Sequence, residues 1–358
     1  MGSETVDLDY LGVEALVAEL AEQDEVLAEV VRSFLLSNPS DRLRNSFRKA
    51  FNRLRAKVKA SDFLCCFQGC TNAAIRSHEI AESRQIRFLA ERENDRVFVD
   101  VLTDDLRGNP YEMCFKETPV KSATTFIGYC KEHDGKLFFE LDKMSDPDNF
   151  HLMNLQFMRT LGREKTECDQ KIRAMKIMVD ELEAIALENP GDGFEEARLI
   201  MMGHLDDQQA ARERVAYVHD KVAVDVQEGK QPIVVKKFSV NEPGYMFSTC
   251  MDTTRPGEDY FFTFLAKKNF DGESFFYVGA LDNRFKQEIF EYCDISTQQG
   301  RWDVSDLMLA LKDRLIFSPG FKGMLDEGMK KIFCRSRLEL GGIDKFLVEL
   351  HLFPSSSV

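Results

Sequence analysis

CCFQGC at residues 65–70 and CKEHD at residues 130–134 are the two stretches that decide the fold of this 358-residue chain. The region 65–134, which also contains SHEI at 77–80, holds five of the nine cysteines and two of the six histidines. A tetrahedral zinc site needs two short Cys/His pairs far apart in sequence, because each tight turn supplies two ligands and the metal joins the turns. The spacing therefore predicts a zinc-stabilised module.

The ligand pairs follow from this spacing. Cys130 and His133 form the second pair, with two residues between them. The first pair is Cys66 with Cys70 or, as the alternative, Cys65 with Cys70, because two adjacent thiols cannot easily bind one ion from one turn. We favour Cys66. The competing interpretation is that these cysteines are small buried hydrophobic residues without a metal.

The composition is that of a reduced, intracellular globular protein. A hydrophobic content of 44% is enough to bury sizeable cores, and 358 residues correspond to two or three domains. No segment reaches the roughly 18 to 20 apolar residues of a membrane span, and the N-terminus does not resemble a signal peptide. An odd number of cysteines fits metal binding better than a disulfide framework. We therefore expect a cytoplasmic protein.

A positively charged stripe is predicted just before the first cysteine turn, despite a formal net charge of −14. Residues 41–59 read DRLRNSFRKAFNRLRAKVK, with apolar side chains every three or four positions, which predicts an amphipathic helix. Its basic face either pairs with the acidic helix before it or contacts nucleic-acid phosphates without sequence preference. Under the second interpretation the contacts are Arg48, Arg53, Arg55, Lys57 and, further along, Arg76.

The hydrophobic pattern predicts an α+β multidomain protein with four parts. Residues 1–60 form a helical hairpin, 61–145 the zinc module, 150–228 a long αα-hairpin, and 230–358 a C-terminal α+β domain. The long hairpin is a candidate spacer or homodimerisation element. The C-terminal domain carries neither a nucleotide-binding loop nor a nucleophile elbow, so its role stays unassigned.

The zinc module resembles the HNH endonuclease superfamily over about 70 to 80 residues. Both have a cysteine turn, a strand that carries a histidine, and a second ligand pair at the start of a helix, the order of a treble-clef or ββα-metal fold. SHEI at 77–80 stands where that family usually has an Asp-His-Ile-type motif, and Cys130-x2-His133-Asp134 stands where it has Cys-x2-Cys-His. The resemblance implies that His78 is the general base and that Asp134 binds a catalytic Mg²⁺ or Mn²⁺ ion.

Two alternatives remain open for His78: it is a zinc ligand with Cys66, Cys70 and Cys130, or it is structural. As a whole, the resemblance implies a nuclease with structural Zn²⁺ that hydrolyses DNA, in bacterial defence against phage or other foreign DNA. Such a nuclease can depend on a partner protein or trigger. The alternative hypothesis is a non-catalytic, zinc-stabilised scaffold or a DNA-binding regulator.

Overall fold

The computed structural model describes residues 63–93, 96–104, 113–143, 149–188, 194–241, 244–252, 260–267, 273–311 and 314–334. They form a mixed structure of helices and antiparallel sheets, consistent with the predicted α+β class. The predicted hairpin at 1–60 lies outside the described residues, as do its basic side chains Arg48, Arg53, Arg55 and Lys57. Residues 167–213 belong to one compact unit, and the other described residues belong to a second.

The module between the two cysteine turns is built on a small, two-stranded antiparallel sheet. Strands β1 (Arg76–His78) and β5 (Thr125–Ile127) pair so that His78 lies opposite Thr125. A single turn of π-helix (Glu82–Ile86) and α4 (Arg87–Leu89) follow β1, and α5 (Lys131–Leu137) and α6 (Phe139–Asp142) follow β5. The two turns that carry the cysteines therefore flank one strand pair.

The segment between β1 and β5 joins a larger sheet. The strands of this sheet are β2 (Glu91–Glu93), β3 (Arg96–Asp104), β4 (Met113–Pro119), β6 (Ile233–Asn241), β7 (Tyr245–Asp252), β8 (Tyr260–Lys267), β9 (Glu273–Leu281) and β10 (Ile316–Phe317). Their order is β2-β3-β10-β7-β8-β9-β6, and β4 also pairs with β3. The segments 61–145 and 230–358, which we expected as separate domains, thus contribute strands to the same sheet and belong to the same unit.

Alternation along the strands explains how the sheet is covered. Tyr245 and Phe247 of β7 pack into a core with Phe276 of β9, beneath α9 (Lys286–Tyr292), α10 (Gln298–Ala310), α11 (Pro319–Met324) and α12 (Glu327–Cys334). Each such buried aromatic side chain contributes roughly 1.5–3 kcal/mol of hydrophobic stabilisation. Successive strand residues point to opposite faces, so Ser248 faces the other side. There its hydroxyl lies 2.7 Å from that of Thr160.

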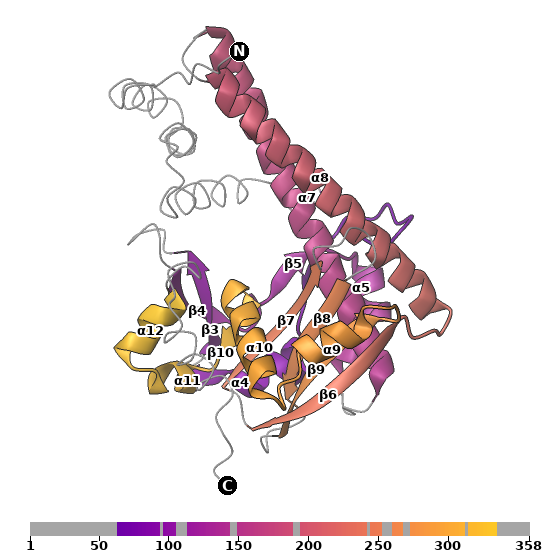
Figure 1. Ribbon diagram of the computed structural model, residues 1–358, viewed down its shortest axis with the longest axis vertical. Helices are drawn as coiled ribbons and strands as arrows, with labels where there is room; N and C mark the ends of the chain where they lie inside the picture. The colour runs from indigo at the N-terminus through magenta and orange to yellow at the C-terminus, as the bar shows by residue number, and fades with distance from the viewer. Residues whose placement is uncertain are drawn as a thin grey trace. The chain divides into compact units, whose positions relative to one another are not determined.

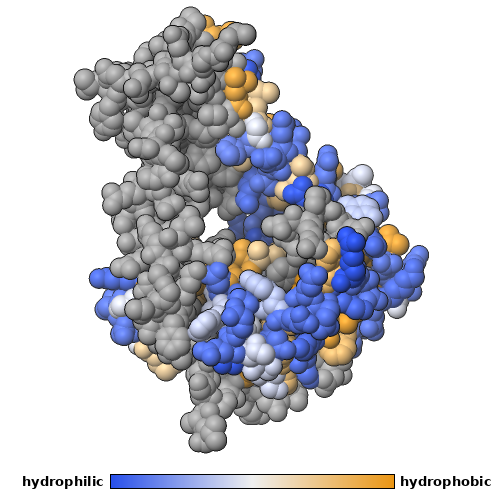
Figure 2. Space-filling model, in the orientation of Figure 1, coloured by the Kyte–Doolittle hydropathy of each residue, from blue (hydrophilic) through white to orange (hydrophobic). Residues whose placement is uncertain are grey.

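The region 150–228 contains two long helices, α7 (Phe150–Glu188) and α8 (Phe194–Gln227), which lie side by side and antiparallel (Figure 1). Arg212 of α8 bonds to Asp169 of α7 at 2.9 Å, which fixes their register in one unit. None of the described helices is both long and apolar enough to cross a membrane. Among the described residues on the face shown in Figure 2, hydrophilic side chains outnumber hydrophobic ones.

Candidate metal centre and adjoining pocket

Four side chains from the two turns converge on one point. The ligand atoms of Cys65, Cys70, Cys130 and His133 all lie within 4.8 Å of one another. The Sγ atoms of Cys70 and Cys130 are 3.9 Å apart, and Nδ1 of His133 lies 3.4 Å from Sγ of Cys65 and 3.4 Å from Sγ of Cys130. Tetrahedral zinc with ordinary bond lengths gives S–S edges of roughly 3.8 Å and S–N edges of roughly 3.5 Å. The donor set and its spacing therefore fit a metal ion such as zinc.

Cys65, the alternative ligand, belongs to this cluster, and the favoured Cys66 does not. The backbone explains the difference. The N–H of Cys65 donates to the Asn72 carbonyl and that of Cys66 to the Gly128 carbonyl, so the two neighbouring residues are held by different segments of the chain. The Cys66 thiol is buried, which raises its pKa and keeps it neutral. His133, rather than His78, completes the set.

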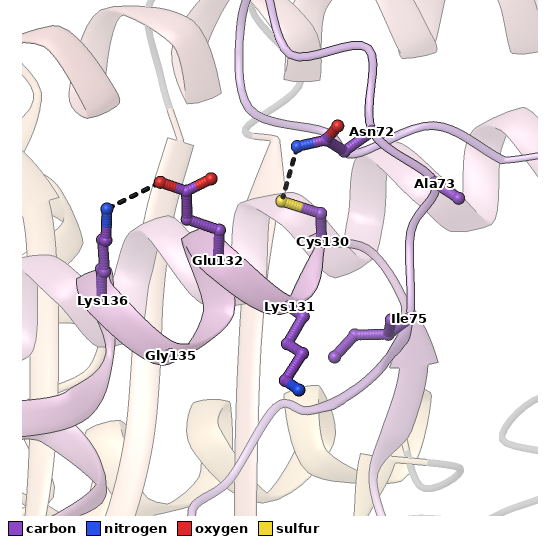
Figure 3. A pocket seen from close by; sticks show the side chains of 8 residues that line it. All are labelled: Asn72, Ala73, Ile75, Cys130, Lys131, Glu132, Gly135 and Lys136. Atoms are coloured by element: carbon purple, nitrogen blue, oxygen red, sulfur yellow. Dashed lines mark hydrogen bonds and ion pairs between the residues drawn. The ribbon is translucent and has the colours of Figure 1, made fainter.

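The surroundings of Cys130 favour a thiolate. Cys130 caps the N-terminus of α5, where its Sγ accepts the backbone N–H of His133 at 3.5 Å. Figure 3 shows the Asn72 side-chain amide directed at the same sulfur atom, at 3.9 Å. Burial opposes ionisation of Cys130, but the backbone N–H groups of His133 and Glu132, together with the Cys65 and Cys70 thiols, lower its pKa. Burial raises the pKa of Cys65 to about 12, so a bound cation is needed to hold that thiolate at neutral pH.

A buried polar chain anchors both turns to the helical hairpin. The Tyr129 hydroxyl, one residue before Cys130, lies 2.9 Å from the Met158 carbonyl oxygen and 2.9 Å from Nε2 of His219. His219 contacts Asp220 at 2.9 Å, and Lys165 contacts Asp220 at 3.3 Å. Lys165 also donates to the Cys66 carbonyl oxygen, at 3.0 Å. In each turn, the residue next to a metal ligand is therefore bonded to the long helices: Tyr129 to α7 and α8, and Cys66 to α7.

The two predicted catalytic residues line one hollow of about 380 Å³. Its other lining residues are Glu82, Ser83, Arg87, Asp142 and Arg159. Nε2 of His78 lies 3.3 Å from the Val120 carbonyl oxygen. A carbonyl only accepts hydrogen bonds, so we assign the proton to Nε2, which leaves Nδ1 with a free lone pair. In the neutral ring, Nδ1 is then the nitrogen that can accept a proton.

Asp134 reaches this hollow from α5, four residues after Cys130. Its backbone N–H donates to the Cys130 carbonyl at 2.9 Å, so the metal turn fixes its position. Burial raises the pKa of Asp134, and the positive charge of Arg159 opposes this only in part. Its Oδ1 atom is buried without a hydrogen-bond partner and lies 3.8 Å from Nη2 of Arg159. This carboxylate oxygen therefore keeps unused acceptor capacity, and the nearby Ser77 hydroxyl acts with Arg159 to favour the charged form of Asp134.

A catalytic divalent ion would find only part of its ligand set here. Among the described residues, the cysteine and histidine cluster is the only group of three or more His, Cys, Asp or Glu side chains that is placed to hold a metal ion. Mg²⁺ usually keeps several waters and binds through one or two carboxylates and substrate phosphate. Asp134 fits that partial role, and the hollow does not hold a preformed cage of protein ligands.

Two arginines, Arg76 and Arg159, differ in where they lie relative to the hollow. Arg76 lies exposed on β1 and does not line the hollow. Arg159 of α7 does line it, although no sequence motif indicates that α7 lies beside residues 78 and 134. One signal was present, since Arg159 occurs at helical spacing from Leu152 and Leu155, on the apolar face of the helix. A charged residue on such a face needs a buried partner.

Comparisons with known proteins add no relative. No family model matches the chain, and neither a curated protein nor a solved structure matches it. The resemblance to HNH endonucleases therefore depends on the motifs of the chain alone.

Proposed function

We propose that this protein is a zinc-containing, HNH-like nuclease that hydrolyses phosphodiester bonds in DNA. One observation carries the proposal: His78 and Asp134 line the same hollow, and Asp134 follows the ligand Cys130 on the same helix. In this proposal the zinc ion is structural, because all four ligand positions are filled by protein side chains.

The chemistry assigns one role to each residue. Nδ1 of His78 takes a proton from the water molecule that attacks phosphorus, since the Val120 carbonyl holds the proton on Nε2. Asp134 would hold Mg²⁺ or Mn²⁺, an ion that would supply positive charge to the phosphate and to the leaving oxygen. The leaving oxygen takes its proton from solvent. We place this activity in bacterial defence against foreign DNA, by extension from the family resemblance alone.

A second candidate is a non-catalytic, zinc-stabilised scaffold or DNA-binding regulator. One observation favours it: the carboxylates around His78 already have cationic partners. Arg159 bonds to Asp142 at 2.7 Å, and Arg87 bonds to Glu82 at 2.7 Å. Under this hypothesis the hollow is a stabilised surface and His78 is structural.

The test is plasmid nicking by the full-length protein with Mg²⁺ or Mn²⁺, and with EDTA as the control. His78→Ala should reduce nicking by at least about 100-fold, the usual contribution of a general base. Bound zinc, measured by elemental analysis, should be unchanged. His151→Ala is the matched control, because His151 lies on α7 and does not line the hollow.

Three results would count against the proposal. Nicking that survives His78→Ala removes the assigned base. Nicking by wild type that does not depend on a divalent ion removes the role of Asp134. A wild-type protein that carries zinc and does not nick DNA supports the scaffold.

A further inference from the structure

Arg159 is the most buried charged group in the hollow. Its side chain is 1% exposed, and it reaches the hollow from α7, outside the zinc module. Nη1 and Nη2 bond to the two carboxylate oxygens of Asp142 at 2.7 and 3.2 Å. The guanidinium carbon lies 4.2 Å from the centre of the Phe138 ring. The guanidinium is therefore held in one orientation before any ligand arrives.

The hydrogen-bond capacity of Arg159 is only partly used. A guanidinium has five N–H donors, and Asp142 takes two of them, which leaves three. Nε is buried and has no acceptor. A buried donor without a partner is destabilising, so the question is which acceptor it binds when a ligand is present. An acceptor that enters the hollow as a ligand would be such a partner.

The charges around His78 indicate the chemistry of that ligand. Two arginine and carboxylate pairs, Arg159 with Asp142 and Arg87 with Glu82, line the hollow together with His78. The third carboxylate of the hollow is Asp134, whose charge the proposed divalent ion would neutralise. Asp142 binds only one edge of the Arg159 guanidinium, so an anion with several oxygen atoms can accept hydrogen bonds from the remaining N–H groups. Phosphate oxygens suit this planar fork of donors. A hollow of about 380 Å³ has room for a phosphodiester group with part of its sugar.

We propose that Arg159 binds a non-bridging oxygen of the scissile phosphodiester, with Asp142 as the residue that positions its guanidinium. This inference rests on the proposed nuclease function and adds a substrate-contacting residue from the helical hairpin. Arg159 fixes the phosphate beside Nδ1 of His78, and its charge stabilises the negative charge that builds up on the phosphate in the transition state.

The test uses full-length protein and a fluorescein-labelled 20-base-pair DNA duplex. Binding is measured between about 50 and 200 mM salt in the His78→Ala background, so that the duplex stays intact. Adding Arg159→Met should weaken binding about tenfold and reduce the salt slope by about one. Arg159→Lys keeps the charge but not the fork, and in the otherwise wild-type protein it should lower nicking at least tenfold.

The matched control is Arg314→Lys. Arg314 is also a buried arginine, with a side chain 6% exposed, and it bonds to Glu164 at 2.6 Å without lining the hollow. Zinc content and the urea midpoint are measured for every variant. Arg314→Lys should leave DNA binding and nicking unchanged.

The outcomes separate this inference from the proposed function. If wild type nicks DNA, and both Arg159 variants bind and nick as wild type does, the phosphate role of Arg159 is wrong and the nuclease stands. If wild type does not nick, yet Arg159→Met still lowers affinity and salt slope, the nuclease is wrong and the phosphate role stands. If Arg159→Met loses zinc or unfolds while Arg159→Lys nicks normally, Arg159 is structural and the inference is overturned.

Discussion

The hydroxyl of Tyr129 lies 2.9 Å from Nε2 of His219, and this contact joins the residue before the metal ligand Cys130 to helix α8. Both side chains are fully buried. In sequence they are 90 residues apart. The metal turn and the helical hairpin therefore form one packed structure at this point, and the stability of one depends on the other.

Tyr129→Phe should lower the free energy of unfolding by about 1–3 kcal/mol. The substitution keeps the ring but leaves Nε2 of His219 and the Met158 carbonyl without the hydroxyl. Urea unfolding of the zinc-loaded protein measures the change. The matched control is Tyr217→Phe, on the same helix as His219. Tyr217 is 63% exposed, so this substitution should change the free energy of unfolding by less than about 0.5 kcal/mol. Equal effects of the two substitutions would show that the buried hydroxyl contributes nothing.

Cys65→Ser and Cys66→Ser should differ in metal content although the two residues are adjacent. Cys65 belongs to the cluster, and Cys66 packs behind it. We expect Cys65→Ser to lose most of its zinc at micromolar free zinc, and Cys66→Ser to keep about one zinc per chain. Elemental analysis after dialysis decides between them. The reverse pattern would restore Cys66 as the ligand.

The sequence alone does not show which of these two cysteines binds the metal. Spacing predicts that two cysteine and histidine turns meet, because few other arrangements satisfy four soft ligands. Spacing does not predict which of the two adjacent thiols faces the metal, since that depends on how the backbone at Cys65 and Cys66 is oriented. The N–H of Cys66 donates to Gly128, and this long-range bond fixes that orientation. No local pattern contains that information.

The strand pairing of the larger sheet could not be predicted from the sequence either. The hydrophobic pattern predicts a zinc module at 61–145 and a C-terminal α+β domain at 230–358, but the pairing of β3 with β10 joins Asp100 to Phe317. Lys322 then bonds to Asp100 at 2.6 Å. Pairings across more than 200 residues depend on tertiary packing, and the two segments look like separate domains when each is considered alone.

The stability of the protein should fall as the pH drops below about 6.5, in part because of His219. Burial lowers the pKa of His219 below its ordinary value of 6.5. Below that pH the unfolded chain takes up a proton at His219 and the folded protein does not, so protonation favours unfolding. The contribution is fully present above pH 6.5 and is lost towards lower pH, by at most about 1.4 kcal/mol per pH unit.

His219→Gln tests this dependence. The variant should be less stable than wild type at pH 7.5, and the difference should shrink as the pH falls to about 5.5. Urea unfolding at both pH values, with zinc present throughout, gives the comparison. His151→Gln is the control, because His151 lies only partly buried near the start of α7. If the difference stays constant with pH, His219 does not titrate in this window.

Gly162→Ala should destabilise the protein, although alanine normally stabilises a helix by about 1 kcal/mol relative to glycine. Gly162 lies within α7, and a Cβ atom there would be 2.4 Å from the Tyr129 hydroxyl oxygen and 2.8 Å from Cζ of the same ring. The ring cannot move away easily, because its hydroxyl is bonded to Met158 and His219. We expect a loss of about 1–3 kcal/mol, the usual cost of overpacking.

Gly203→Ala provides the matched control for this clash. Gly203 lies in α8, and a Cβ atom there meets no heavy atom within 4 Å, so the substitution should stabilise the protein by about 0.5–1 kcal/mol. Opposite signs for the two alanine variants in urea unfolding would show that the close approach of α7 to the Tyr129 ring, and not helix propensity, determines the residue at position 162. Zinc content should then also fall in Gly162→Ala, because a displaced Tyr129 moves Cys130. A stabilised Gly162→Ala variant would contradict the packing of α7 against the metal turn.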